Sequence, residues 1–382
     1  MKQIACKYAL LLGAVLSCTA AARSQAPDGP LPPRPGQTVQ QPPPNTQAKL
    51  KVQVALVNMP VTVRDNKGEM VHDLDAKDFR ITDNGVEQRI SHFDFGGDPV
   101  SLVILLETSS RIDPILPEMR KAGILFTQMV MGLDGEAAVV GFNDGVDKLQ
   151  DFTNNADAIE NVVTRLQTGT SGLKLYDAMA IGVDMLASRK PQPTVDGPGK
   201  RRVMLVLSET VDSGSETKLG EVLRKAQLAN ITIYSVGLST TRSELHSEPK
   251  HKGPAPIAPP GISTLPPAPG RAPGPGNEST GSAVDLLGLA IWAVEHADNK
   301  VKDHAMEVAC VATGGEHLST YKNRSIENAI DDIGAELHAQ YTISYAPSGT
   351  NDFGYHEIKV EVHRKNMKVR ARPGYYVVPP EG

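Results

Sequence analysis

The chain has 382 residues, a formal net charge of −5 and only 4% aromatic residues. This length suffices for two packed domains, and a mildly acidic, aromatic-poor chain lacks the basic stripe and stacking platforms of a nucleic-acid surface. Beyond residue 22, no apolar run approaches the length of a membrane-spanning helix. We therefore expect a largely soluble protein with no nucleic-acid partner.

The amino terminus predicts export. Residues 1–22 place two lysines before an apolar run and then a stretch of small residues, which is the pattern of a secretory signal. Two processing routes stay open. The stretch 15–18 (VLSC) resembles a lipoprotein site that would leave a lipid anchor on Cys18, whereas cleavage near 20–22 would release a soluble protein. Both routes predict an extracytoplasmic protein, periplasmic or secreted, whose only membrane contact is that anchor.

Two proline-rich stretches interrupt the rest of the chain. Residues 23–48 cannot bury a core and are typical of a linker. Residues 249–277 have little apolar content besides proline, so we expect a disordered insert. Cys310 is the only cysteine after the signal, which excludes an intramolecular disulfide in the processed chain. We expect Cys310 to act as a small buried hydrophobe.

Residues 49–97 form a region of β alternation. Apolar residues alternate from 50 to 56, and Asp83-Asn84-Gly85 is a strong hairpin signal. This region has too few strands to close a core by itself. Residues 339–378 also alternate, and their basic run 363–372 is typical of an edge strand. We therefore expect the two regions to pair as one flanking β-sandwich.

Residues 98–338 alternate between strands and helices. Short β-rich runs are separated by segments with apolar residues at helical spacing. This alternation predicts an α/β domain with a doubly wound, mostly parallel, Rossmann-like sheet and helices on both faces. The expected strands are 100–106, 137–142, 202–207 and 231–236, and the expected helices are 115–131, 156–166, 175–187, 218–229, 283–296, 301–313 and 325–338.

The stretch 100–111 (VSLVILLETSSR) is the most informative of these strands. An unbroken apolar run ends abruptly at Glu107, Ser109, Ser110 and Arg111. Ligands bind at the carboxyl ends of the strands in open α/β sheets, so we expect these side chains at a binding edge. Carboxylate and hydroxyl oxygens suit a hard cation such as Mg²⁺, but an arginine among them does not.

Several stretches together resemble the type A domain of von Willebrand factor (VWFA), and specifically the VWFA-related family of Acidobacteria. The resemblance covers nearly all of residues 50–376. It implies a doubly wound sheet with a metal-ion-dependent adhesion site, built from Asp-x-Ser-x-Ser after the first strand, a threonine from a second loop and an aspartate from a third. The carrying stretches are 100–112, 175–178 (LYDA), 205–208 and 312–315 (ATGG), flanked by 61–81 and 369–375.

This sequence departs from that ligand set at most positions. Glu107 replaces the first aspartate, Ser109 matches, Arg111 replaces the second serine, and Glu209 replaces the aspartate of the third loop. An arginine beside a dication costs energy even when screened, whereas it pairs well with Glu107 and Glu209. We therefore expect an internal arginine–carboxylate cluster in place of the ion. The alternatives are that Arg111 simply points into solvent, or that Mg²⁺ binds through Glu107, Ser109 and Glu209.

The second loop departs as well. An ungapped alignment places Leu173 at the threonine position, and Thr170 or Ser171 could substitute only if the loop shifts. No Gly-x-Ser-x-Gly elbow, His-Glu-x-x-His pair or phosphate-binding glycine loop is present in the sequence.

These observations favour an exported, non-enzymatic binding or adhesion protein without a cofactor. It would recognise a protein partner of the cell envelope or exterior through the upper face of the α/β domain. The alternatives are a structural cell-envelope scaffold with no ligand site and an extracytoplasmic hydrolase, for which no catalytic pair is present. The expected binding surface consists of Glu107, Ser109, Ser110, Arg111, Thr170, Ser171 and Glu209.

Overall fold

A computed structural model describes part of the chain. The predicted signal, the linker 23–48, the insert 249–277 and the predicted helix 283–296 lie outside the described residues. No helix within the described ranges is both long enough and apolar enough to cross a membrane. The structure describes residues 56–96, 99–131, 134–189, 200–209, 211–238, 304–320, 325–348 and 353–377.

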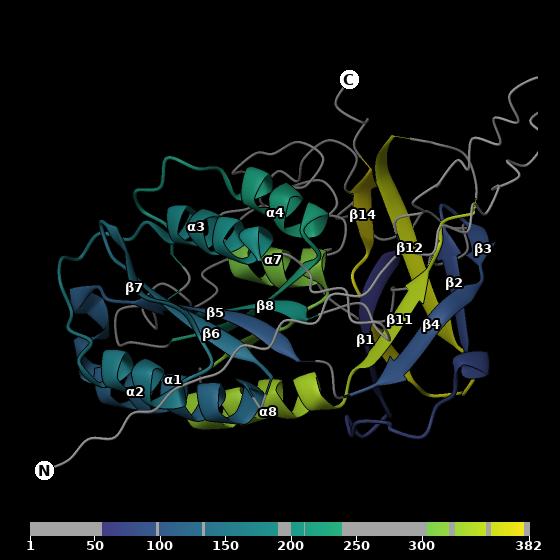
Figure 1. Cartoon of the computed structure of the whole chain (residues 1–382), viewed down its shortest axis with the longest axis horizontal. Helices are drawn as coiled ribbons and strands as arrows, with labels where there is room; N and C mark the ends of the chain where they lie inside the picture. The colour runs from purple at the N-terminus through teal and green to yellow at the C-terminus, as the bar shows by residue number, and fades with distance from the viewer. Residues whose placement is uncertain are drawn as a thin grey trace, which may run out of the picture. The chain divides into compact units, whose positions relative to one another are not determined.

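A six-stranded sheet, in the order β10-β9-β8-β5-β6-β7, forms the centre of the α/β domain (Figure 1). Neighbouring strands are parallel except for β6 and β7, which are antiparallel. Numbered along the chain, this is the doubly wound order 3-2-1-4-5-6, so the predicted fold class is confirmed. The strands are β5 (Val100–Glu107), β6 (Glu136–Phe142), β7 (Val146–Thr153), β8 (Arg201–Ser208), β9 (Ile231–Gly237) and β10 (His317–Ser319).

Helices cover both faces of this sheet. Alternate residues of β5 enter different cores: Val103 and Leu105 pack with α3, α4 and α7, whereas Leu102 and Ile104 pack with α1, α2 and α8. Figure 1 shows these two groups of helices on opposite sides of the strands. The helices are α1 (Leu116–Met131), α2 (Ala156–Thr164), α3 (Leu175–Ser188), α4 (Leu219–Leu228), α7 (Ala305–Thr313) and α8 (Ile326–His338), and a 3-10 turn η2 (Ser110–Ile115) precedes α1.

Two four-stranded antiparallel sheets, β13-β1-β11-β4 and β14-β12-β2-β3, share one hydrophobic core. β1 pairs with both β11 and β13, and β2 pairs with β12, so strands from residues 57–95 and 341–377 build one sandwich, as predicted. The strands are β1 (Val57–Arg64), β2 (Phe79–Asp83), β3 (Val86–Gln88), β4 (Ile90–Phe95), β11 (Tyr341–Tyr345), β12 (Gly354–Val362), β13 (Lys368–Arg370) and β14 (Gly374–Val377), with a 3-10 turn η1 (Ala76–Asp78) before β2.

Local sequence signals account for the turns of this fold. Asn84 and Gly85 join β2 to β3 with positive φ angles of 47° and 81°, which a two-residue hairpin turn with a primed geometry requires. Gly314 ends α7 at φ 84°, where its backbone N–H donates to the carbonyl of Val311. The hairpin signal read from the sequence is therefore present in the structure, and a glycine in the left-handed conformation ends α7.

A cluster of polar residues joins the sandwich to the α/β domain. Glu336 of α8 is 1% exposed, yet its carboxylate accepts hydrogen bonds from Arg64 of β1 at 3.2 Å, from Arg370 of β13, and from Tyr234 of β9 at 2.8 Å. Gln340 donates to Glu336 at 3.2 Å and to the Tyr234 hydroxyl at 2.7 Å. We call these five residues the Glu336 cluster. Two guanidinium groups neutralise its buried carboxylate, so the cluster fixes the sandwich against α8 and β9.

Candidate functional site

The carboxyl ends of β5 and β8 lie side by side. Leu106 pairs with Leu207 across the two parallel strands, so the residues that follow them meet at one edge of the sheet. Glu107 of β5 thereby faces Ser208 and Glu209 at the end of β8. The structure therefore brings two of the predicted site carboxylates into one cluster.

Glu107 is fully buried, and neutral donors surround its carboxylate. One oxygen, Oε1, accepts a short hydrogen bond from the Ser109 hydroxyl. The other, Oε2, accepts from the Ser208 hydroxyl at 2.8 Å and from the backbone N–H of Glu209 at 2.8 Å. Burial raises the pKa of the Glu107 carboxyl above its ordinary value, and these hydrogen bonds offset only part of the rise.

Arg111 pairs with the second carboxylate of the site. Its Nη1 lies 3.7 Å from Oε2 of Glu209, whose side chain is 3% exposed, while the Arg111 side chain is 21% exposed. The predicted arginine–carboxylate contact therefore forms with Glu209. Arg111 makes no ion pair with Glu107, because the Glu107 carboxylate turns inward to the β8 end. The Arg111 Nε atom is buried without a hydrogen-bond partner among the described residues.

The turn after β5 fixes where Arg111 points. The Ser109 hydroxyl caps η2 by accepting from the backbone N–H of Arg111 at 3.3 Å, while donating its own proton to Glu107. Ser109 therefore has two roles: it donates a hydrogen bond to the carboxylate at the end of β5, and it caps η2. Ser110, the next residue, is exposed, and its backbone N–H donates to the Thr170 carbonyl at 3.1 Å.

The second loop presents different atoms from those that the resemblance implies. Leu173, at the expected threonine position, is fully buried, and its backbone N–H donates to the Ser213 hydroxyl at 3.0 Å. An apolar side chain at this position packs into the core and offers no oxygen. Thr170 and Ser171 are exposed beside it, so the predicted surface residues of this loop do reach solvent. Within the described ranges, no three His, Cys, Asp or Glu side chains gather as a metal-binding group.

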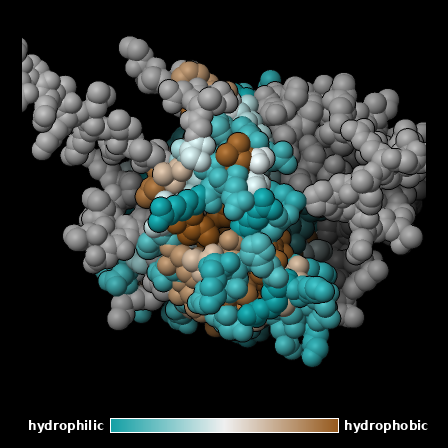
Figure 2. Space-filling view, turned by 90° about the vertical axis from the view of Figure 1, so that its right-hand side faces the viewer, coloured by the Kyte–Doolittle hydropathy of each residue, from teal (hydrophilic) through white to brown (hydrophobic). Residues whose placement is uncertain are grey.

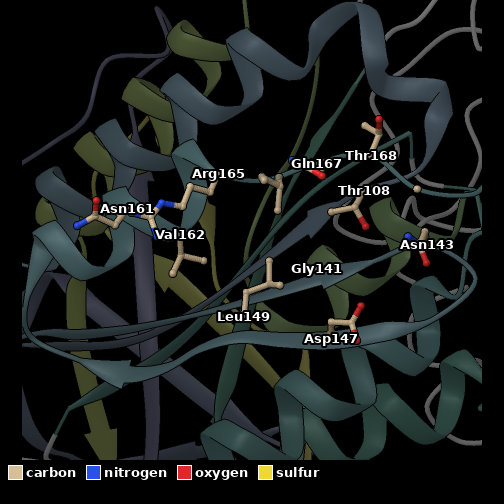
Figure 3. Close-up of a pocket in the computed structure, with 12 residues that line it drawn as sticks. Thr108, Gly141, Asn143, Asp147, Leu149, Asn161, Val162, Arg165, Gln167 and Thr168 are labelled. Atoms are coloured by element: carbon tan, nitrogen blue, oxygen red, sulfur yellow. The ribbon is translucent and has the colours of Figure 1, made fainter.

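A pocket of about 370 Å³ lies next to the first two loops (Figure 3). The two loops meet at its wall, where the Gly169 backbone N–H donates to the Thr108 carbonyl at 2.8 Å. Figure 3 shows Asn161 and Arg165 at one end and Asn143 and Asp147 at the other. The pocket is lined by Thr108, Gly141, Asn143, Asp147, Leu149, Asn161, Val162, Arg165, Leu166, Gln167, Thr168 and Gly169.

Sequence reasoning missed two parts of this site. Ser208 was available from the sequence, because β8, like β5, is an apolar run that ends in a hydroxyl residue and a glutamate. The pocket was not, since its walls come from β7 and the end of α2, and β7 carries too many charged residues for an apolar run to mark it.

Comparisons with known proteins give likenesses of structure alone. No protein-family profile matches the sequence, and no curated protein matches it. The crystal structure of a conserved hypothetical protein, BatB from Bacteroides thetaiotaomicron, is 12% identical, with 62% of this chain and 98% of that chain covered at a TM-score of 0.38. An aerotolerance-related membrane protein from Bacteroides fragilis gives 12% identity over the same shares and a TM-score of 0.36.

A third solved structure is the vWF domain of the type V pili tip protein Mfa5 from Porphyromonas gingivalis. It is 16% identical, with 38% of this chain and 43% of that chain covered at a TM-score of 0.26. At these identities and TM-scores, none of the three carries information about what this chain binds.

Proposed function

We propose that this chain is an exported, non-enzymatic binding protein of the VWFA-related type, which recognises a protein partner in the cell envelope or outside the cell. Recognition takes place at the loops that follow β5, α2 and β8, and it does not use a metal ion. The observation that carries this proposal is the Arg111–Glu209 pair at the position where the resemblance implies a cation.

The donor set does not fit a bound Mg²⁺. Both oxygens of Glu107 already accept hydrogen bonds from the chain, and the Ser109 hydroxyl is directed at one of them. Mg²⁺ requires near-ideal octahedral oxygen geometry, which these bonded groups could supply only by breaking their contacts. The guanidinium beside Glu209 adds repulsion of about 4 kcal/mol per unit charge at 4 Å for an effective dielectric constant near 20.

The same loops offer groups that suit a protein partner. Ser110, Thr170 and Ser171 are exposed, and Arg111 is partly exposed beside them. Arg111 has donors beyond the one that faces Glu209, and a guanidinium binds carboxylates and carbonyl oxygens well. A carboxylate or backbone carbonyl of the partner would then contact Arg111 directly, where a metal-dependent domain would use its ion.

A pull-down from envelope extract, with and without chelator, tests this proposal. We expect the wild type to retain the same partner band in both conditions and Arg111→Ser to lose it. Arg80→Ser is the matched control, because Arg80 forms an exposed ion pair with Glu87 on the sandwich, and it should retain the band. Loss of the band with chelator would contradict metal-independent recognition. Micromolar binding of Mg²⁺ or Mn²⁺ by calorimetry, abolished by Glu107→Ala, would contradict it as well.

A structural envelope scaffold is the second candidate function. This candidate is favoured because polar groups of the site hydrogen-bond to each other within the chain. The Ser109 hydroxyl donates to Glu107, and the Ser213 hydroxyl accepts from the backbone N–H of Leu173. A scaffold of this kind predicts envelope assembly that neither chelator nor Arg111→Ser affects. The hydrolase alternative loses support because Ser109 is fully buried, which keeps its hydroxyl away from a substrate.

A further inference from the structure

β4 is an edge strand of the sandwich and carries outward-facing backbone groups. It is the last strand of the order β13-β1-β11-β4, so no described strand pairs with its outer side. The Gly96 N–H donates to the Gln340 carbonyl at 2.9 Å, which makes this a hydrogen-bonded pair of the β4–β11 ladder. Because such pairs alternate in antiparallel sheets, the backbone N–H and C=O groups of Asp94 and His92 also point toward β11. The backbone groups of Phe93 and Phe95 point away from it, toward the open edge.

The side chains at this edge are apolar. Phe95 is 40% exposed, and its ring lies 4.8 Å from that of Tyr341. Phe93 is half-buried against Phe79 and Tyr341, with ring centroids 5.5 and 5.6 Å apart. Figure 2, which faces the sandwich side of the molecule, shows a hydrophobic area framed by hydrophilic residues. An exposed edge strand with apolar side chains is a template for pairing with another strand.

Charge selects one register if the second strand is another β4. Residues with outward backbone groups must face one another, so an antiparallel pair can place His92, Phe93 or Asp94 opposite its own copy. The first arrangement sets two histidines against each other, and the last sets two aspartates against each other. Only the arrangement centred on Phe93 sets His92 opposite Asp94 at both ends, within the part of β4, His92 to Phe95, that pairs with β11 in a regular register.

We propose that two copies of this chain associate by antiparallel pairing of their β4 strands, with Phe93 on the two-fold axis and His92 opposite Asp94 of the second copy. The two Phe93 rings then pack against each other and cover the open end of both sandwich cores. The Phe95 N–H, which in the single chain donates to Oδ1 of Asp94 at 2.8 Å, donates instead to a carbonyl of the second strand. The Asp94 carboxylate is thereby released to face His92.

Cysteine trapping tests the register. In a chain with Cys6→Ser and Cys18→Ser, Phe93→Cys places two thiols across the axis, where opposite Cα atoms in a hydrogen-bonded pair lie about 5.5 Å apart, within disulfide range. We expect a disulfide-linked dimer under mild oxidation, while the buried Cys310 stays unlinked. His92→Cys and Asp94→Cys are the matched controls and should give no such dimer, since each reaches itself only in a rejected register. A dimer from either control and none from Phe93→Cys would overturn the proposed pairing.

Sedimentation velocity over a concentration series tests the association without altering the core. The wild type should show a monomer–dimer equilibrium, and Asp94→Lys should raise the dimer dissociation constant roughly tenfold, because it removes the carboxylate that faces His92 in both cross-strand pairs. Asp94 is exposed, so this variant is expected to fold normally. Asp94→Asn, which keeps the acceptor for the Phe95 N–H, should have a smaller effect. A wild type that stays monomeric, or an Asp94→Lys variant that dimerises as the wild type does, overturns the proposal.

Discussion

Glu107 and Glu336 are both buried glutamates with fully bonded carboxylates, but their partners differ in charge. Glu336 accepts from two guanidinium groups, those of Arg64 and Arg370. Glu107 accepts only from two serine hydroxyls and a backbone N–H. The first carboxylate therefore lies against two positive charges, whereas burial among neutral donors raises the pKa of the second.

This difference in partners corresponds to a difference in role: Glu336 holds two parts of the fold together, whereas Glu107 belongs to the candidate binding site. The Glu336 cluster lies between two packed parts of the fold, where a neutralised ion pair fixes their geometry. Glu107 lies at the carboxyl end of the sheet, beside exposed loops, and the cation nearest to the site pairs with Glu209 instead. We therefore expect substitutions in the Glu336 cluster to act mainly on stability, and those around Glu107 to act more weakly on stability and in a pH-dependent way.

Arg370→Ala gives the largest expected effect. It removes a guanidinium from a carboxylate that is 1% exposed, and breaking a buried ion pair costs about 3 kcal/mol or more. The free energy of unfolding, measured by denaturant titration at neutral pH, should fall by about this amount. Arg80→Ala, which breaks an exposed pair, should change it by less than about 0.5 kcal/mol. Equal effects for the two variants would mean that the Glu336 cluster does not hold the sandwich against α8 and β9.

Arg111→Ala should have an intermediate effect. Glu209 is nearly buried and would lose its ion-pair partner, so we expect a loss of about 1–2 kcal/mol in the free energy of unfolding. A double-mutant cycle with Glu209→Gln isolates the contact, and the two substitutions should be coupled by at least about 0.5 kcal/mol. Strict additivity would show that Arg111 points into solvent, which is the alternative reading of the sequence.

Ser208→Ala should cost about 1 kcal/mol, because it removes one of three neutral donors to the buried Glu107. Ser110→Ala is the control on the neighbouring loop, since its side chain is exposed, and it should leave the free energy of unfolding nearly unchanged. Thermal melts of both variants in one buffer make the comparison. A neutral Ser208→Ala would indicate that the backbone N–H and Ser109 alone hold the carboxylate.

Glu107→Gln should give the smallest change in the free energy of unfolding at any one pH, and the direction in which this change varies with pH tests the assignment. Because the folded-state pKa of Glu107 is raised above its ordinary value of 4.5, its stabilising contribution is complete below that value and is lost as the pH rises through the folded-state pKa. The variant lacks this loss, so the free energy of unfolding of the wild type should fall relative to that of the variant as the pH increases from 4.5. Unfolding titrations at several pH values measure the trend, and the opposite slope would contradict the assignment.

The sequence predicts the central sheet well because burial on both faces leaves a plain signal. β5, β6, β8 and β9 are short apolar runs, and each forms within one residue of its expected bounds. β7 and β10 were not predicted. β7 is an edge strand with three charged residues, and β10 has only three residues, so neither shows the periodicity of a buried strand.

The site was harder to predict, because its contacts depend on side-chain direction. The sequence places Glu107, Arg111 and Glu209 near one another, since parallel strands end at a common edge. It does not show that Glu107 turns toward Ser208 while Arg111 turns toward Glu209. The basic run 363–372 shows the same limit: β13 is an edge strand, as expected, yet Arg370 bonds the buried Glu336.

The pairing of strands in the sandwich also determines which part of the protein can fold first during synthesis. β1 lies between β11 and β13, and Val57 pairs with Tyr345, about 290 residues later in the chain. At synthesis rates of about 5–20 residues per second, β1 emerges from the ribosome tens of seconds before its neighbours exist. All strands of the α/β domain precede Tyr341 in the chain, so this domain can fold before β1 has a strand to pair with. A chain truncated before Tyr341 would keep the sheet that carries Glu107 and lose every strand partner of β1.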